Sequence, residues 1–186
     1  MKRIFDIVLA SMFFIVFSFP MLIVAVLVKV TSKGPVLYWS DRVGRYNEIF
    51  KMPKFRTMCV DTPAVATHLM KNPDIYLTPI GSFLRKFSLD ELPQLYSILK
   101  GDISFVGPRP ALYNQDDLVG LRTGKGIHRL IPGITGWAQV NGRDELPIPI
   151  KVEFDEYYLK NRSFLFDMKI LWMTFVKVVR REGVVH

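Results

Sequence analysis

The apolar residues of the chain are concentrated in its first thirty positions. Residues 7–28 contain no charged side chain, and the apolar stretch extends back to Ile4 across a single acid, Asp6. A run of about 25 residues forms a helix roughly 37 Å long, which is enough to cross a bilayer. It exceeds the roughly 7–15 apolar residues of a secretory signal, and residues 29–33 do not resemble a cleavage site. We therefore predict a membrane segment over residues 1–30.

Two features of this segment bear on how it enters the membrane. Pro20 removes one backbone hydrogen bond and bends a helix, and the Ser18 hydroxyl can bond back to the preceding turn. Basic residues favour the cytoplasmic side, and they flank both ends of the segment: Lys2, Arg3, Lys29, Lys33, Arg42 and Arg45. A re-entrant helix that breaks near Pro20 and returns to the same face explains this symmetry. A spanning helix kinked at Pro20 is the alternative that the residues leave open.

The pattern over residues 31–186 is mixed and predicts one compact domain. β-prone pieces lie within residues 36–58, and residues 61–78, rich in Pro and Thr, are expected to form a surface excursion with about one helical turn. Helices are predicted at 150–160 and 164–181. The second has an apolar and a basic face, so it either packs on the core or lies among lipid headgroups, and we favour the headgroups. The expected fold is α/β, mostly helical, with few short strands and interfacial amphipathic helices.

Another amphipathic helix is predicted to begin near residue 90. One apolar stripe is formed at i, i+3, i+4 and i+7 by Leu92, Leu95, Tyr96 and Leu99, and Gly101 closes the helix. Proline is tolerated only in the first helical turn, so Pro93 sets the start at about Asp90. Asp90 and Glu91 are therefore expected at the helix N-terminus, where Ser88 and Glu91 match the capping-box pattern S-x-x-E.

Composition narrows the choice of partners. The chain has 25 Lys and Arg against 17 acids, a net charge of +8, which favours nucleic acid, lipid headgroups or phosphorylated small molecules. The mean hydropathy of +0.20 is high for a nucleic-acid binder and favours an anionic membrane. The single cysteine, Cys59, excludes an internal disulfide, and the three histidines show no ligand-like spacing.

The adjacent acids Asp90 and Glu91 are the first candidate site. A helix cap needs only one acid, whereas this pair lies in a basic stretch with Arg85, Lys86, Lys100 and Arg109. Such surroundings are expected to lower the carboxylate pKa and to bind phosphate, which suits an ionised nucleophile. Mg²⁺ prefers one or two carboxylates with phosphate oxygens, so the pair is also a candidate magnesium site. A plain helix cap remains the structural alternative.

Two further motifs combine rigid or small residues with polar side chains. In Gly-Pro-Arg-Pro at 107–110, two prolines fix the backbone around Arg109, whose guanidinium suits bidentate phosphate binding. In residues 132–143, two glycines allow close approach of backbone to a ligand, and Trp137, Gln139 and Arg143 supply a stacking face, an amide and a cation. A nucleotide or sugar would use such groups, whereas a rigid turn and a packed tryptophan would need no ligand.

Taken in order, five motifs resemble the bacterial sugar transferase family, the monotopic polyprenyl-phosphate phosphoglycosyl transferases. They are KRIFD at 2–6, KFRTM at 54–58, SLDELPQ at 88–94, GDISFVGPRP at 101–110 and PGITGWAQVNGR at 132–143. The resemblance covers nearly the whole chain, whose length resembles that of members consisting of the catalytic domain alone. It implies transfer of a phosphosugar from a UDP-sugar to polyprenyl (undecaprenyl) phosphate, with release of UMP. It also implies a place at the cytoplasmic face of a bacterial inner membrane, at the start of glycoconjugate assembly.

The resemblance also implies roles for single residues. Asp90 would form a covalent phosphosugar intermediate, and Glu91 would help to hold Mg²⁺. The expected substrate-binding residues are Lys54, Arg56, Arg85, Arg109, Trp137, Gln139 and Arg143. The expected partners are a UDP-sugar, polyprenyl phosphate and a phospholipid membrane, and not nucleic acid. The family breaks its re-entrant helix at adjacent Ser and Pro, whereas here Phe19 separates Ser18 from Pro20.

Two other functions compete with this one. The first is a membrane-anchored, metal-dependent phosphodiesterase or nuclease, which would act on nucleic acid without a lipid acceptor. The second is a non-catalytic membrane-interaction module in which the acids at 90 and 91 only cap a helix.

Overall fold

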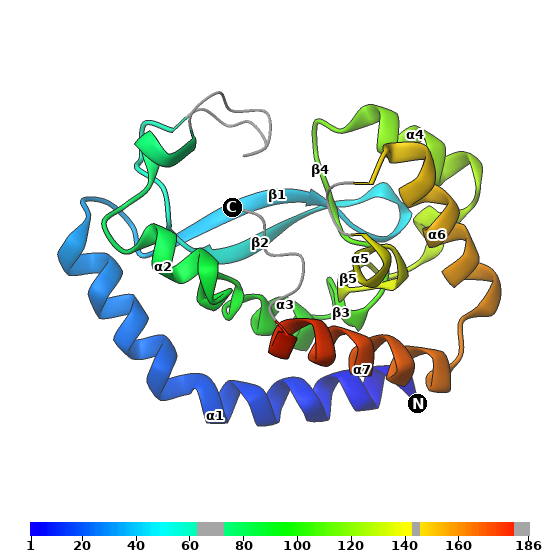
Figure 1. Cartoon of the computed structure of the whole chain (residues 1–186), viewed down its shortest axis with the longest axis horizontal. Coiled ribbons are helices and arrows are strands. Elements are labelled where there is room, and N and C mark those ends of the chain that lie inside the picture. Colours follow the sequence, from blue (N-terminus) through cyan, green and yellow to red (C-terminus); the bar gives the residue numbers. More distant parts are fainter. Residues whose placement is uncertain (63–72, 143–145, 181–186) are drawn as a thin grey trace. The chain divides into compact units, whose positions relative to one another are not determined.

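The computed structural model describes residues 1–62, 73–142 and 146–180. The described chain is mostly helical with few strands (Figure 1). Its α-helices are α1 (Lys2–Thr31), α2 (Gly81–Lys86), α3 (Gln94–Lys100), α4 (Asp116–Gly124), α5 (Trp137–Asn141), α6 (Ile148–Asn161) and α7 (Phe164–Arg180). Its strands are β1 (Leu37–Val43), β2 (Ile49–Phe55), β3 (Ser104–Val106), β4 (Ala111–Leu112) and β5 (Gly133–Thr135). Single 3₁₀ turns are η1 (Arg45–Asn47), η3 (Pro73–Tyr76), η4 (Leu89–Glu91) and η5 (Ile127–Arg129).

The chain forms two compact units. The 51–97 unit consists of Leu9–Ser40 and Lys51–Ser97, and the 98–186 unit consists of Met1–Val8, Asp41–Phe50 and Ile98–His186. Compactness does not define which residues are embedded in lipid. The expected boundary between a membrane segment (1–30) and a catalytic domain (31–186) therefore stays a prediction.

α1 is a single helix that contains Pro20. The Ser18 hydroxyl donates to the Ile15 carbonyl at 2.7 Å, as predicted for a serine that supports a bend, and the ribbon of α1 is curved (Figure 1). By length and composition α1 is able to cross a membrane, and only 11% of its most apolar 18-residue window is buried. A core helix of a soluble protein would be mostly buried, so this apolar surface fits lipid better than a protein interior.

The second half of α1 supplies part of the core of the 51–97 unit. Val24 and Val28 pack with Phe55 of β2 and Leu84 of α2, all nearly inaccessible to solvent. The buried Arg56 fixes the end of the helix, because its guanidinium donates to the Ser32 hydroxyl at 2.9 Å and to the Pro35 carbonyl at 2.7 Å. The final turns of α1 are therefore part of this unit's folded interior.

The predicted start of the helix near residue 90 was wrong. Residues 89–91 form the 3₁₀ turn η4, and the α-helix α3 begins only at Gln94. Ser88 adopts a left-handed conformation (φ 53°) and makes no side-chain capping bond, so the expected capping box does not form. The predicted helix end is confirmed, since Gly101 follows α3 with a φ of 104°. The two acids therefore lie on a tight turn ahead of the helix.

In the 98–186 unit, close backbone contact links the motifs at 107–110 and 132–143. Strand β3 pairs in parallel with β5, with Ser104 opposite Gly133 and Val106 opposite Thr135. A Cβ atom at Gly133 would lie 2.1 Å from the Gly107 nitrogen, and one at Gly136 would lie 2.1 Å from the Gly107 carbonyl oxygen. The glycines permit a close approach of backbone, as predicted, but the partner that they meet is Gly107 rather than a ligand.

The helices predicted at 150–160 and 164–181 are confirmed as α6 and α7. α7 runs along the first turns of α1 (Figure 1), where the Lys2 ammonium donates to Asp167 at 2.6 Å and the Phe5 and Phe164 rings meet edge to face. Apolar side chains remain exposed on α7: Leu165, Trp172, Phe175, Val178 and Val179. The β-prone stretch at 36–58 is confirmed as β1 and β2, and β2, β1 and β4 form one sheet in that order. Of the excursion at 61–78, residues 63–72 lie outside the described residues and 73–76 form the single turn η3.

Two glycine-to-alanine changes test the importance of the backbone contact. Gly136→Ala should lower the free energy of unfolding by about 1–3 kcal/mol, because its methyl group overlaps the Gly107 carbonyl. Gly120→Ala, in α4 with nothing within 4 Å, should raise it by about 0.5–1 kcal/mol through helix propensity. Denaturant unfolding of the full chain in detergent measures both. Equal effects of the two changes would contradict the contact.

Candidate active site

The Asp90 carboxylate is held out of water by the turn η4. Asp90 is only 7% exposed, although its turn is part of the short connection between α2 and α3. The left-handed Ser88 redirects the chain just before it, and consecutive i→i−3 backbone bonds carry the turn from Ser88 into α3. The sequence thus places one acid inside the unit and its neighbour Glu91 at the edge.

Two basic side chains from other elements converge on this turn. The Lys54 ammonium, from β2, donates to Glu91 Oε1 at 2.7 Å, with both side chains partly buried. Arg85, at the end of α2, donates through Nε to the Thr57 hydroxyl at 3.0 Å and interacts electrostatically with Asp90. Asp90, Glu91, Lys54 and Arg85 therefore form one cluster inside the 51–97 unit.

The expectation that basic neighbours lower the pKa of Asp90 was wrong. Burial raises the pKa of its carboxyl to about 6, an effect that Lys54 and Arg85 oppose and the Glu91 charge reinforces. Removing water from a carboxylate disfavours the charged form, and here that effect exceeds the attraction of two cations. Asp90 is still mostly ionised at neutral pH. It is also more basic than an ordinary aspartate, which favours nucleophilic attack.

Arg85 is partly buried next to the negative charges of Asp90 and Asp74. Burial lowers the pKa of its guanidinium, while the Asp90 and Asp74 carboxylates raise it. An arginine stays protonated under these conditions, so it keeps a fixed positive charge beside the carboxylate. That charge can stabilise phosphate oxygens brought to Asp90.

The other predicted substrate-binding residues divide between the two units. Arg56 lies in the 51–97 unit, and its described donors hold the end of α1. Arg109, Trp137 and Gln139 lie in the 98–186 unit, and Arg143 lies outside the described residues. Their contacts with substrate stay predictions.

Trp137 and Gln139 have contrasting surroundings. The Trp137 ring stacks on Tyr157 at 5.8 Å between centroids and packs against Phe166 at 5.0 Å, as a packed tryptophan would. The amide of Gln139 has buried oxygen and nitrogen atoms without a hydrogen-bond partner in the described part of the chain. An unpaired buried amide is costly, and a bound ligand or water would satisfy it.

Asp90 and Glu91 offer only two carboxylates to a metal ion. Among the described residues, no group of three or more His, Cys, Asp or Glu side chains is placed to hold one. Two adjacent carboxylates fit Mg²⁺ if phosphate oxygens and water complete its shell. Lys54 already contacts Glu91, so a cation at Glu91 would share or displace this ammonium.

Two residues that contact or act on Arg85 of this cluster were not predicted from the sequence. Thr57 accepts the Arg85 bond, and Asp74 adds negative charge beside Arg85. Thr57 falls inside the KFRTM motif, so the motif was a signal for it. Asp74 falls in the stretch where no chemistry was expected, and nothing in its pattern distinguishes it.

Comparison with known proteins identifies the family. The model of a family described as "Bacterial sugar transferase" matches residues 1–181. The chain belongs to the bacterial sugar transferase family. It is 41% identical to the uncharacterized sugar transferase EpsL of Bacillus subtilis, over 99% of this chain and 90% of EpsL. The family predicted from the five motifs is thus confirmed.

Other relatives of this sugar transferase chain are named for a reaction. It is 39% identical to the UDP-N-acetylgalactosamine-undecaprenyl-phosphate N-acetylgalactosaminephosphotransferase of Aeromonas hydrophila, over 98% of this chain and 44% of that protein. It is 40% identical to the UDP-glucose:undecaprenyl-phosphate glucose-1-phosphate transferase of Escherichia coli, over 95% of this chain and 40% of that protein. The chain therefore spans less than half the length of these two relatives. Their names agree with the prediction that the chain is an enzyme of the phosphoglycosyl transferase class.

Replacing the buried acid should stabilise the fold. With a native pKa of about 6 against about 4 when unfolded, ionised Asp90 destabilises the native state by up to about 3 kcal/mol. The folded state binds the proton more tightly, so this loss develops as pH rises from about 4 through 6. Asp90→Asn should therefore be more stable than the parent at pH 8 and should lose this advantage below pH 4.

Urea unfolding of the full chain in detergent between pH 4 and 8 measures this difference. Asp116→Asn, which removes an exposed acid in the first turn of α4, should give no gain at any pH. A simple helix cap at Asp90 would make Asp90→Asn neutral or destabilising, which would contradict the buried environment.

Proposed function

We propose that the chain transfers a sugar phosphate from a UDP-sugar to polyprenyl phosphate at the cytoplasmic face of a bacterial inner membrane, the first membrane step of glycoconjugate assembly. The observation that carries this proposal is the buried Asp90 carboxylate, placed beside Lys54, Arg85 and Glu91 in a chain of this family. Relatives named for UDP-sugar and undecaprenyl-phosphate substrates support the choice of donor and acceptor.

In the first step, an Asp90 carboxylate oxygen attacks the sugar-bearing phosphorus of the UDP-sugar. A bond forms between that oxygen and phosphorus, the bond from this phosphorus to the bridging oxygen breaks, and UMP leaves with the electron pair. Lys54 and Arg85, whose charges act on Asp90, would stabilise the phosphate charge that accumulates near it. Positioned nucleophiles of this kind divide one difficult transfer into two easier ones.

In the second step, a phosphate oxygen of the polyprenyl phosphate attacks the same phosphorus and releases the Asp90 carboxylate. The product is a polyprenyl diphosphate sugar, and no proton has to be supplied to either leaving group. Glu91 with Asp90 would hold Mg²⁺, which would neutralise diphosphate charge when bound. Arg109 of Gly-Pro-Arg-Pro would bind a phosphate group of the substrates.

The membrane contacts follow from the apolar surfaces of two helices. We propose that α1 enters and leaves the same face of the bilayer, bending near Pro20, and that α7 lies among the headgroups. The exposed apolar side chains of α7 and its basic residues Lys169 and Lys177 suit that position. An acceptor whose polyprenyl tail stays in the bilayer then meets a protein that is embedded in one leaflet.

The covalent intermediate gives the direct test of function. Full chain in detergent, incubated with individual UDP-sugars and Mg²⁺ but no acceptor, should gain the mass of one phosphosugar on Asp90, measured by intact and peptide mass spectrometry. Asp90→Asn should gain none. Transfer to added polyprenyl phosphate without any adduct would indicate direct transfer, and hydrolysis of nucleic acid instead would indicate a nuclease.

The pH dependence of adduct formation tests the environment of Asp90. The rate should fall about tenfold per pH unit below a midpoint near 6, because only the ionised carboxylate attacks. Lys54 lowers the pKa of Asp90, so Lys54→Met should move the midpoint to higher pH. A midpoint near 4, or one that Lys54→Met moves downward, would contradict the cluster described above.

Labelling tests the topology of α1. In a Cys59→Ser background, a cysteine ahead of residue 1 and another at Lys33 should react with an impermeant thiol reagent from the same side of sealed vesicles. The reagent applied to inside-out and right-side-out vesicles gives the two measurements. Reaction from opposite sides would show that the helix spans the bilayer.

A further inference from the structure

The Gly-Pro-Arg-Pro loop is held through three consecutive carbonyl groups. The Pro108 carbonyl accepts the backbone N–H of Gly133 at 2.9 Å. The Arg109 carbonyl accepts Nη1 of Arg122 at 2.8 Å, and the Pro110 carbonyl accepts Nη1 of Arg42 at 3.3 Å. Pro108 and Pro110 have no backbone N–H, so most hydrogen bonds that hold the loop are accepted by its carbonyls. One anchor is main chain, and the other two are arginine side chains.

Arg122 is the more firmly fixed of these two arginines. Its Nε and Nη2 donate to Asp155 Oδ2 at 2.9 and 2.6 Å, which joins α4 to α6. The Asp155 side chain is 1% exposed and that of Arg122 is 12% exposed. A guanidinium clamped by a buried carboxylate has little rotational freedom left, so its remaining donor reaches Arg109 in a defined direction.

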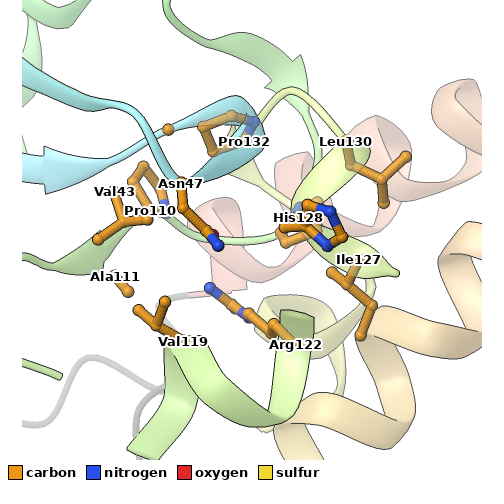
Figure 2. Close-up of a pocket in the computed structure, with 12 residues that line it drawn as sticks. Val43, Asn47, Pro110, Ala111, Val119, Arg122, Ile127, His128, Leu130 and Pro132 are labelled. Atoms are coloured by element: carbon orange, nitrogen blue, oxygen red, sulfur yellow. The ribbon is translucent and has the colours of Figure 1, made fainter. Parts of the chain in front are cut away.

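Side-chain packing alone does not fix the back of the loop. A small cavity of about 30 Å³ lies there, lined by Pro108, Pro110 and Pro132 together with Arg122 and His128. Figure 2 shows the side chains of Arg122 and Asn47 extending into this pocket from opposite sides. The volume suffices for about one water molecule. Beside this cavity, hydrogen bonds to the carbonyls therefore add to the backbone contacts that hold the loop.

We propose that Arg122, clamped by Asp155, is a positioning residue that fixes the backbone at Arg109 so that the Arg109 guanidinium meets a substrate phosphate. This rests on the proposed function, in which Arg109 binds phosphate. Arg122 acts through the Arg109 carbonyl and touches no substrate itself. Displacement of a positioned group by about 1 Å can lower a rate about a hundredfold, so such support matters for transfer.

The chain contains a matched control for the ion pair. Lys125, the residue that follows α4, contacts Glu156 of α6 at 2.5 Å, so it links the end of α4 to α6 about one turn away. Lys125→Met removes this link without changing a donor to the loop. Arg122→Lys keeps a positive charge for Asp155, but one ammonium does not reproduce the fork that reaches both acceptors. Asp155→Asn is a second variant, which keeps an acceptor oxygen for Arg122.

Hydrogen exchange measures the loop without reference to activity. In Arg122→Lys, the amides of residues 104–112 should exchange about tenfold faster than in the parent, and in Asp155→Asn by a smaller factor. Lys125→Met should leave these amides unchanged. Unchanged exchange in both Arg122→Lys and Asp155→Asn, or an equal increase in Lys125→Met, would overturn the proposal.

A double-mutant cycle then tests the link to Arg109. Arg122→Lys should lower kcat/KM for the UDP-sugar about tenfold in the parent chain and should have no further effect in Arg109→Ala. Independent, multiplying losses would overturn the proposal and leave Arg122 as a structural residue. Absence of transfer by the parent chain would refute the proposed function instead, and the exchange result would still decide whether Arg122 fixes the loop.

Discussion

The 51–97 unit keeps one carboxylate largely out of water, and this constraint sets the electrostatics of the cluster around Asp90. Burial of Asp90 opposes its ionisation, and Lys54 and Arg85 offset only part of that cost, so the pKa of the group rises to about 6. A protein selected for stability alone would not retain such a group, because an uncharged residue of the same shape fits better. The uncompensated cost of burying the ionised carboxylate makes its oxygens more basic, which would serve the proposed attack on phosphorus.

The two segments that carry Asp90 and Arg109 reach rigidity by different physical means. The Asp90 turn is compact because a left-handed Ser88 and successive 3₁₀ bonds force a tight path, and burial then raises the pKa of Asp90. The Gly-Pro-Arg-Pro loop is fixed by prolines, by glycine contacts with β5 and by arginines that hold its carbonyls. In each case a charged side chain is carried on backbone that has little freedom left to lose on binding.

Much of the secondary structure, and the family, was predictable from short stretches of sequence. The β-prone stretches, α6, α7 and the terminal Gly101 follow from periodicity and backbone preference, and five ordered motifs identified the family. The start of α3 was missed because Pro93 does not reveal that Ser88 adopts a left-handed conformation and that residues 89–91 form a 3₁₀ turn. The direction of the Asp90 pKa shift was missed because a sequence shows which charges are near but not how much water remains. Arg122 was missed because the short α4 has no clear apolar stripe: besides Arg122, its nine residues include two Asp, one Thr and two Gly.

α1 is better regarded as part of both folded units than as an attached anchor. Its first turn belongs to the 98–186 unit, where Asp6 accepts the Ser104 hydroxyl at 2.8 Å at the start of β3, the strand that leads to Gly-Pro-Arg-Pro. Its later turns belong to the 51–97 unit, where Val28 is fully buried beside Phe55. Removing α1 would therefore take core and polar contacts from both units. For the same reason α1 and the polar sites cannot be optimised independently, which suits the proposed function, in which one substrate is water-soluble and the other is a lipid.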